Sequence, residues 1–180
     1  MTQRVFAWFA CACLALLAAR PVPAQSPALP YRLGPGDQLR VTVFGSPELS
    51  GQYTVDGEGR IMLPLIQSVR AAGLTPAELA VVIAERYSPN YLVNAQVSVD
   101  IVEYRPYFIL GEVNKPGGYA YRQGMTALVA VARAGGFTER ANTRKVIVIR
   151  AHDPQRKKRR LSVHVPVYPG DIVTVPERFF

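Results

Sequence analysis

One short pattern occurs twice in the chain, once near each end, and it fixes where two strands begin. Pro35-Gly36-Asp37 and Pro169-Gly170-Asp171 are each followed by a run of strand-like alternation. Proline sets its own φ in such a turn, and glycine supplies conformations that are closed to other residues. The alternation that follows predicts a half-buried strand. The repetition is either a shared structural device or a coincidence of turn chemistry, because an aspartate in such a turn commonly satisfies backbone N–H groups locally.

Residues 31–104 form a first predicted unit that is rich in strands. Residues 39–43 alternate as a strand, and residues 53–55 and 60–63 flank an Asp-Gly pair that favours a hairpin turn. Residues 97–101 alternate as a further strand.

One helix is predicted to cover these strands. Thr75 offers an N-cap hydroxyl, a proline follows it, and Glu78 can reach back to the cap, which together signal a helix start. Apolar residues then recur at helical spacing as far as Tyr87, and Pro89 stops the helix.

A second unit is predicted over residues 107–177, after a linker at Arg105 and Pro106. A short helix capped by Thr126 precedes a glycine pair that suits a left-handed C-cap. Five strands are predicted around it, over residues 107–110, 119–122, 145–150, 161–165 and 172–175. This order suits a helix packed on a mixed sheet, so the whole chain is predicted to be an α+β protein of two small domains.

Residues 1–24 have the pattern of a cleaved secretory signal. Arg4 precedes an unbroken run of 15 apolar residues, and small residues close the segment before the expected cleavage after Ala24. That run reaches about 22 Å as a helix, short of the ~30 Å hydrocarbon core of a membrane. Residues 25–30 are predicted to be a flexible leader, and the mature protein is expected to be exported.

The remaining residues offer little for metal, cofactor or thiol chemistry. Cys11 and Cys13 lie inside the predicted signal, and His152 and His164 have no third nitrogen ligand. We therefore expect no cofactor and no metal.

Candidate catalytic groups are equally sparse. Asp56 and Glu58 come closest to a carboxylate pair, but they bracket a glycine in a turn, where acids are ordinarily solvated. We therefore predict that the protein is not an enzyme and has no catalytic residues.

The chain is basic, and its strongest charge feature is a run of five consecutive cations. Removal of residues 1–24 takes away Arg4 and Arg20 and leaves 19 basic against 13 acidic residues, a net charge of +6. The run is either a solvated loop or a contact for anions such as acidic sugars, phosphates or an acidic partner. Nucleic acid is not expected, because basic and aromatic residues are not interleaved on one face. The candidate polyanion contacts are Arg156, Lys157, Lys158, Arg159 and Arg160.

Two tyrosines are candidates for stacking on a sugar or for an interface. Tyr119 and Tyr121 alternate around Ala120 and are predicted to face one side of a strand. The alternative is a packing role, because tyrosine buries a large area while its hydroxyl finds a polar partner.

Taken in order, these motifs resemble the outer-membrane polysaccharide export family of Gram-negative bacteria, over nearly all of residues 31–177. Residues 31–104 resemble its N-terminal export domain, and residues 107–177 resemble one soluble-ligand-binding β-grasp (SLBB) domain. The turn residues that carry the resemblance are Gly34, Pro35, Gly36, Asp37, Pro116, Gly117, Gly135, Gly136, Pro169, Gly170 and Asp171.

The resemblance implies a periplasmic, ring-forming homo-oligomer that is associated with the outer membrane. Such a ring passes an exopolysaccharide or capsule polymer on from an inner-membrane polysaccharide copolymerase. Larger members add further domains and a C-terminal pore-forming helix. Because the chain ends soon after Pro176, a separate outer-membrane channel protein is expected to complete the path. The alternative function is a monomeric periplasmic module that binds a glycan or another polyanion.

Overall fold

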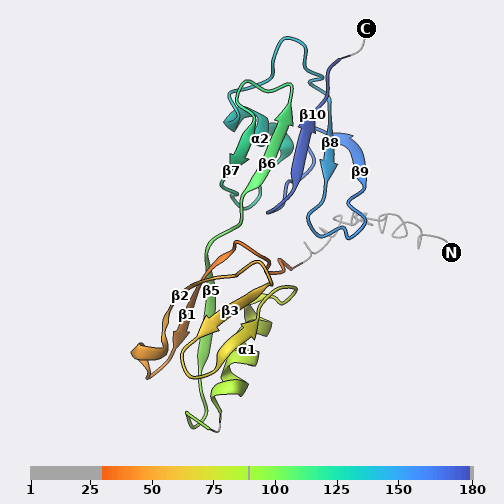
Figure 1. Cartoon of the computed structure of the whole chain (residues 1–180). Coiled ribbons are helices and arrows are strands. Elements are labelled where there is room, and N and C mark those ends of the chain that lie inside the picture. Colours follow the sequence, from red (N-terminus) through yellow and green to blue (C-terminus); the bar gives the residue numbers. More distant parts are fainter. Residues whose placement is uncertain (1–29, 89, 179–180) are drawn as a thin grey trace, which may run out of the picture.

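The computed structural model of the chain describes residues 30–88 and 90–178, which form two domains joined end to end (Figure 1). The N-terminal domain (residues 31–104) and the C-terminal domain (residues 105–178) each have their own hydrophobic core. The predicted signal, all of the leader except Pro30, and Pro89 lie outside the described residues. Within the described ranges, no helix has the length and apolar character needed to cross a membrane.

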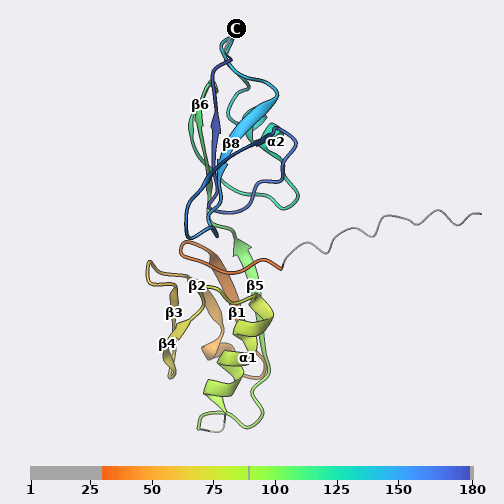
Figure 2. The same ribbon diagram turned by 90° about the vertical axis from the view of Figure 1, so that its right-hand side faces the viewer.

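The N-terminal domain is built on a three-stranded antiparallel sheet in the order β2-β1-β5. Its core lies between this sheet, helix α1 and a separate β3–β4 hairpin. Figure 2 shows the hairpin on one side of the domain and α1 on the other. The elements are β1 (Gln38–Val43), the 3-10 helix η1 (Pro47–Leu49), β2 (Gly51–Thr54), β3 (Arg60–Leu63), β4 (Gln67–Arg70), α1 (Pro76–Tyr87) and β5 (Val97–Glu103).

The helix start predicted at Thr75 is confirmed. The Thr75 hydroxyl accepts from the Glu78 backbone N–H at 3.2 Å, and the Glu78 carboxylate accepts from the Thr75 N–H at 2.8 Å. This reciprocal capping satisfies two of the N–H groups that a helix start leaves without partners.

The predicted hairpin between residues 53–55 and 60–63 is wrong in its pairing. The turn forms, with the Glu58 and Arg60 N–H groups donating to the Asp56 carboxylate, but β2 pairs with β1 and β3 pairs with β4. The β3–β4 turn places Leu65 and Gln67 at φ values of 64° and 56°. Because neither residue is a glycine or an asparagine, the sequence does not signal these left-handed positions, and Pro64 is the one typical turn residue between the two strands.

The C-terminal domain is a five-stranded mixed sheet with helix α2 on one face, in the order β7-β6-β10-β8-β9. Strands β6 and β10, the first and last of the domain, lie parallel at its centre, and the other pairs are antiparallel. This arrangement confirms the α+β fold class and the helix on a mixed sheet. The elements are β6 (Tyr107–Gly111), β7 (Gly117–Tyr119), α2 (Ala127–Arg133), β8 (Lys145–Ile149), β9 (Lys158–Ser162) and β10 (Ile172–Val175).

Strand β9 begins three residues earlier than predicted, inside the basic run. Lys158 pairs with Ile149 and Ser162 with Lys145, so the ladder closes over residues 158–162 and not 161–165. The strand is hard to recognise in the sequence because its first three residues are all cations. Successive side chains of a strand point to opposite faces, so Lys158 and Arg160 share one face and Arg159 lies on the other.

Helix α2 ends as the sequence predicts. Gly135 and Gly136 follow it with φ values of 81° and 90°, and the Gly136 N–H donates back to the Val131 carbonyl. Both values lie in the left-handed region that glycine tolerates best.

Gly111 is the glycine whose replacement we expect to damage the fold most. Its φ is 83°, and a Cβ built there lies 2.2 Å from the Val175 carbonyl oxygen, at the end of the parallel β6–β10 pair. Gly124 has a similar φ of 79° but has open space around it.

We predict that Gly124→Ala destabilises the protein by about 1 kcal/mol, the cost of a left-handed alanine. Gly111→Ala should cost several kcal/mol more, because the backbone must move. Urea unfolding of both variants measures the difference, and equal losses would contradict the close approach of Gly111 to Val175.

Candidate functional site

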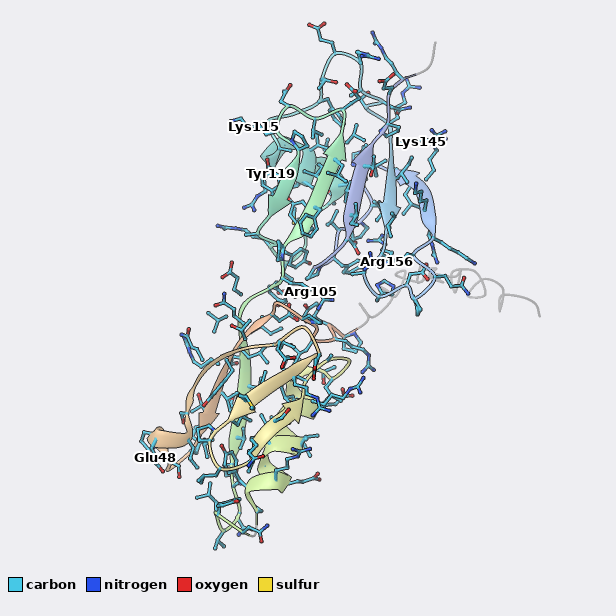
Figure 3. The ribbon with its side chains drawn as sticks, in the orientation of Figure 1. Glu48, Arg105, Lys115, Tyr119, Lys145 and Arg156 are labelled. Carbon is cyan, nitrogen blue, oxygen red and sulfur yellow. The ribbon has the colours of Figure 1, made fainter. Side chains whose placement is uncertain are left out.

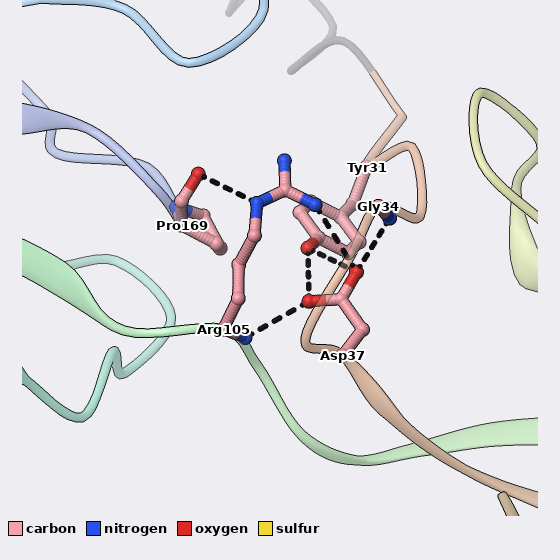
Figure 4. A network of polar contacts seen from close by, with 5 residues as sticks. All are labelled: Tyr31, Gly34, Asp37, Arg105 and Pro169. Atoms are coloured by element: carbon pink, nitrogen blue, oxygen red, sulfur yellow. Dashed lines mark hydrogen bonds and ion pairs between the residues drawn. The ribbon is translucent and has the colours of Figure 1, made fainter. Parts of the chain in front are cut away.

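The buried carboxylate of Asp37 lies at the junction between the two domains (Figure 4). It accepts hydrogen bonds from the Tyr31 hydroxyl at 2.7 and 2.8 Å, the Gly34 N–H at 2.8 Å and the Arg105 N–H at 2.9 Å. The Arg105 guanidinium lies 3.3 Å from the same carboxylate. A fully buried charge requires partners of this kind, because burial removes the water that would solvate it.

Asp171 is buried in the same way in the second Pro-Gly-Asp turn. It accepts from the Tyr168 N–H at 2.9 Å and the Ala151 N–H at 3.1 Å, and it pairs with Arg150 at 2.6 Å. Each aspartate thus takes one N–H from the residue three positions earlier. Each aspartate also accepts a hydrogen bond from a second backbone N–H and forms an ion pair with an arginine. Both of these partners lie in the segment that follows the neighbouring antiparallel strand. The repetition in the sequence is therefore a shared structural device.

A tyrosine completes each copy of this arrangement. The Arg105 guanidinium lies 5.6 Å from the centre of the Tyr31 ring, and that of Arg150 lies 5.0 Å from the centre of the Tyr168 ring. Both distances fall in the range of a cation–π contact. Burial, followed by the hydrogen bond to Asp37, raises the pKa of Tyr31 well above its ordinary value.

Arg105 joins the two copies. Its Nε donates to the Pro169 carbonyl at 3.3 Å, and the Gly170 N–H donates to the Pro106 carbonyl at 3.1 Å. A Cβ at Gly34 would lie 2.1 Å from the Arg105 Nη1, and one at Gly170 would lie 2.8 Å from its Nε. The two turns therefore need glycine so that one arginine side chain fits between them.

Both turns are evident in the sequence, but neither arginine partner is. Arg105 falls in the predicted linker, and Arg150 falls at the end of a predicted strand. Pairing Asp37 with Arg105 spans 68 positions in the chain, and no local pattern encodes that distance. Each arginine lies just after the end of a strand, and this shared position is the signal that could have located both arginines.

A cleft of about 460 Å³ opens at the junction. Its lining includes Tyr31, Arg105, His152, Tyr168 and Pro169. Because Asp37 already neutralises Arg105, the cleft offers aromatic edges and a histidine and has no unpaired buried cation among the described residues.

The basic run is divided between a loop and a strand. Arg156 lies in the turn between β8 and β9, as Figure 3 shows, with a φ of 46°. Lys158 to Arg160 lie in β9, at the edge of the sheet. Of the five cations, only Arg159 forms an ion pair with another described residue, Asp153, at 3.3 Å.

The ion pair with Arg159 makes only a minor contribution to the lowered pKa of Asp153. The backbone N–H of Gln155 is the main cause that lowers the pKa of Asp153, and the Arg159 guanidinium adds to it. The loop before β9 is therefore closed chiefly by the aspartate side chain.

The two domains carry opposite net charge. Residues 31–104 hold five basic and eight acidic residues, a net charge of −3, whereas residues 105–178 hold 14 basic and five acidic residues, a net charge of +9. The basic character of the protein is thus confined to the C-terminal domain, where an anionic ligand would be attracted.

Tyr119 and Tyr121 are both packed against neighbouring tyrosines. The Tyr119 ring stacks on Tyr107 at 6.0 Å, and its hydroxyl donates to the Lys115 carbonyl at 2.6 Å. Tyr121 lies beyond the end of β7 and packs edge-on against Tyr104 at 5.3 Å. Their place in the structure suits a packing role, and contact with a glycan stays a prediction.

The turn at Pro116 and Gly117 meets the glycine pair that follows α2. The Asn114 N–H donates to the Gly136 carbonyl at 3.1 Å, and the Asn114 side chain donates to the Gly135 carbonyl at 2.6 Å. The structure therefore brings the predicted turn residues together in two pairs.

The remaining polar candidates are arranged as turn and surface groups. Asp56 holds backbone N–H groups of its own turn, and Glu58 lies 3.9 Å from Arg60. The His152 ring contacts Tyr168 edge-on at 6.5 Å. Among the residues that the structure describes, no group of three or more His, Cys, Asp or Glu side chains is placed to hold a metal ion.

Comparison with known proteins connects both domains to polysaccharide export. Residues 25–102 match the family described as polysaccharide biosynthesis/export protein, and residues 106–158 match the SLBB domain. The chain is 36% identical over 143 residues to the exopolysaccharide production protein ExoF of Rhizobium meliloti, covering 72% of this chain and 34% of ExoF.

Two further relatives cover similar parts of the chain. The polysialic acid transport protein KpsD of Escherichia coli is 28% identical over 125 residues, which are 68% of this chain and 22% of KpsD. The EPS I polysaccharide export outer membrane protein EpsA of Ralstonia nicotianae is 30% identical over 142 residues, covering 64% of this chain and 37% of EpsA. The chain thus spans between 22% and 37% of the length of these relatives.

The double role of Arg105 leads to a test of the junction. We predict that Arg105→Gln and Arg150→Gln each destabilise the protein by about 3 kcal/mol, because each leaves a buried aspartate without its cation. Only Arg105→Gln should also loosen the domain arrangement, since Arg105 pairs with Asp37 of the N-terminal domain and also donates to Pro169, whereas Arg150 pairs with Asp171 inside the C-terminal domain. Residual dipolar couplings report domain alignment, and they should fit one alignment tensor for the wild type and for Arg150→Gln but not for Arg105→Gln. A single tensor for all three would contradict this role of Arg105.

The raised pKa of Tyr31 predicts an alkaline loss of stability. A tyrosine in the unfolded chain releases its proton near pH 10, whereas folded Tyr31 keeps its proton to higher pH. The unfolded state therefore gains by deprotonation first, and the stability that Tyr31 contributes declines as the pH rises above about 10. Tyr31→Phe should cost about 1 kcal/mol at pH 8, and this cost should shrink between pH 10 and 11. Denaturant unfolding at each pH measures it, and a constant difference would count against the assignment.

Proposed function

Because the chain belongs to the polysaccharide export family, with an export domain followed by one SLBB domain, we propose that it is a non-enzymatic component of a polysaccharide export system. The observation that carries this proposal is the order of the two matched domains, shared with relatives named for exopolysaccharide production, polysialic acid transport and polysaccharide export. The protein acts in the periplasm at the outer membrane, after export by its signal, and exopolysaccharide or capsule polymer is its cargo.

The protein assembles as a ring of identical copies. Exposed apolar side chains lie on two opposite sides of the N-terminal domain: Met62 and Leu65, 69% and 55% exposed, on the β3–β4 hairpin, and Val81, 57% exposed, on α1 (Figure 2). Contact between two different surfaces of one domain produces a head-to-tail assembly, and such an assembly forms a closed ring when its rotation closes. These two surfaces support a ring in which each hairpin meets the α1 helix of the next copy.

The ring receives polymer from an inner-membrane copolymerase and delivers it to a separate outer-membrane channel. The segments that follow β1 and α1 lie at the end of the N-terminal domain far from the junction (Figure 1). They expose Phe44 and Val93, which are 63% and 91% exposed. Exposed apolar residues of this kind favour contact with another protein, and they support this end as the one that meets a partner.

A monomeric glycan-binding module is the second candidate function. The four cations of the basic run that lack an ion pair in the described ranges favour it, because they are available to an anionic ligand. The two functions differ in oligomeric state, which light scattering measures directly.

The proposed function predicts a specific pattern in cells and in solution. A strain lacking the protein should lose most of its surface polysaccharide, and the wild-type gene should restore it. Met62→Glu or Val81→Glu should convert the oligomer to monomers, because a buried unpaired carboxylate is costly, and neither variant should restore export.

Val102→Glu is the matched control, since Val102 is exposed on β5 and lies outside both proposed contacts. It should leave mass and export unchanged. Light scattering of membrane extracts gives the mass, and circular dichroism checks the fold. Normal surface polysaccharide in the deletion strain, or a wild type that is monomeric throughout, would overturn the proposal.

A further inference from the structure

The sheet of the C-terminal domain has an apolar face that nothing in the described structure covers. Helix α2 packs on one side, and the other side is open in Figure 2. The strand register places Phe108 beside Ile172 and Ile172 beside Ile149, in one row across three strands. Leu110, Thr174 and Ile147 form the next row. Phe108 and Leu110 are 45% and 44% exposed.

The sheet of the N-terminal domain shows that a two-layer fold does not require such a face. Its outward side carries Arg40 opposite Asp100, and Thr42 opposite Ser98. Gln52 continues the first of these rows onto β2. This side is mostly polar, as expected for a sheet face in contact with water, although Val102 of β5 is 44% exposed on it. The apolar face of the C-terminal sheet therefore calls for an explanation in terms of a ligand.

The ring of Phe108 extends over its neighbour on strand β7. Gly118 is its cross-strand neighbour on β7, and a Cβ added at Gly118 would lie 3.1 to 3.9 Å from three atoms of the ring. The glycine thus leaves room for the ring to cover the backbone of β7. Phe108 is nevertheless 45% exposed.

Two of the five cations border this face. Lys158 lies opposite Ile149, and Arg160 lies opposite Ile147, so both share the face of Phe108. Arg159 lies between them, opposite the buried Val148, and points to the other side of the sheet, where it pairs with Asp153. Lys158 and Arg160 form no ion pair within the described ranges and are free to bind an anion.

The spacing between aromatic ring and cations suits an extended ligand. Phe108 and Lys158 lie in one row that runs from β6 through β10 and β8 to β9. Three strand spacings separate them, or roughly 14 Å. A ligand that contacts both ends needs a flat apolar surface at one end and a negative charge at the other.

We propose that this face, defined by Phe108, Leu110, Ile147, Ile149, Ile172, Lys158 and Arg160, is a binding platform for a short segment of an acidic polysaccharide. The inference rests on the proposed function, and it specifies the cargo as acidic. One sugar ring packs its C–H groups on Phe108, the isoleucines form the floor, and carboxylates further along the chain pair with Lys158 and Arg160. A second copy is disfavoured as the occupant, because two C-terminal domains, each of net charge +9, repel one another and the outward N-terminal sheet is polar.

The alternation along β9 provides a sharp test with the full-length mature protein. We expect calorimetry to detect binding of an oligogalacturonate of six to eight units, chosen to extend over about twice the distance between Phe108 and Lys158, and to detect much weaker binding of a neutral dextran of equal length. The binding should weaken with added salt, because exposed charges are screened. The double variant Lys158→Gln with Arg160→Gln should bind about tenfold more weakly, since it loses two exposed ion pairs.

Two single variants separate the platform from a diffuse basic patch. Arg159→Gln is the matched control, because it removes a neighbouring cation from the opposite face and should change affinity less than about twofold. Phe108→Leu keeps an apolar side chain but loses the aromatic ring, and it should weaken binding severalfold. Thermal melting confirms that each variant is folded.

Each of the following outcomes would contradict the proposed binding platform. Equal losses from Arg159→Gln and the double variant would show that only the total charge matters. Equal binding of dextran would show that acidity is irrelevant, and a fall in oligomer mass for Phe108→Leu with unchanged affinity would identify the face as a contact between copies. A wild type that binds no acidic oligosaccharide, combined with export that is lost in the deletion strain, would refute the platform and leave the proposed function standing.

Discussion

The ion pair between Asp37 and Arg105 is the interaction on which the arrangement of the molecule depends. Burying a carboxylate is unfavourable unless its oxygens are hydrogen-bonded and a cation lies close by. Asp37 meets this requirement with donors from three places: the start of the N-terminal domain at Tyr31, its own turn at Gly34, and the linker at Arg105. The same guanidinium then contacts Pro169 in the C-terminal domain. The Asp37–Arg105 pair therefore links four segments, and a displacement of any of the three that donate to Asp37 would leave its buried carboxylate short of a partner.

The second copy of the motif explains why the junction is compact. Asp171 organises its turn with Arg150 and Ala151 as Asp37 does with Arg105. The two turns can then present glycines to one another across the Arg105 side chain. These contacts of Arg105 link the turn of the N-terminal domain to the turn of the C-terminal domain. If the protein assembles into the proposed ring, the same residues would link the stability of the junction to the geometry of that ring.

The local features of this fold could be predicted from the sequence, and the long-range ones could not. The Thr75–Glu78 capping box and the Gly135–Gly136 helix end involve residues within a few positions of each other, and both are confirmed. The β3–β4 hairpin escaped prediction because its turn uses Leu65 and Gln67 in left-handed conformations that no residue type signals. The partners of Asp37 and Asp171 escaped it because they come from strands whose register only the folded sheet defines. The same holds for the basic run, which is one continuous patch in the sequence and is divided between two faces once β9 pairs with β8.

The contrast between the two sheets shows where function can be encoded without altering the fold. In both domains the inward residues of the strands are apolar, and the core depends on them. The outward residues are under no such constraint, and they differ: polar on β1 and β5, apolar with a cationic border on β6, β10, β8 and β9. Since alternate residues of a strand belong to different faces, a substitution at Lys158 or Arg160 can alter an outer surface while Val146 and Val148 keep the core intact. If this face binds polymer as proposed, changing every second residue of these strands would alter its ligand and leave the core unchanged.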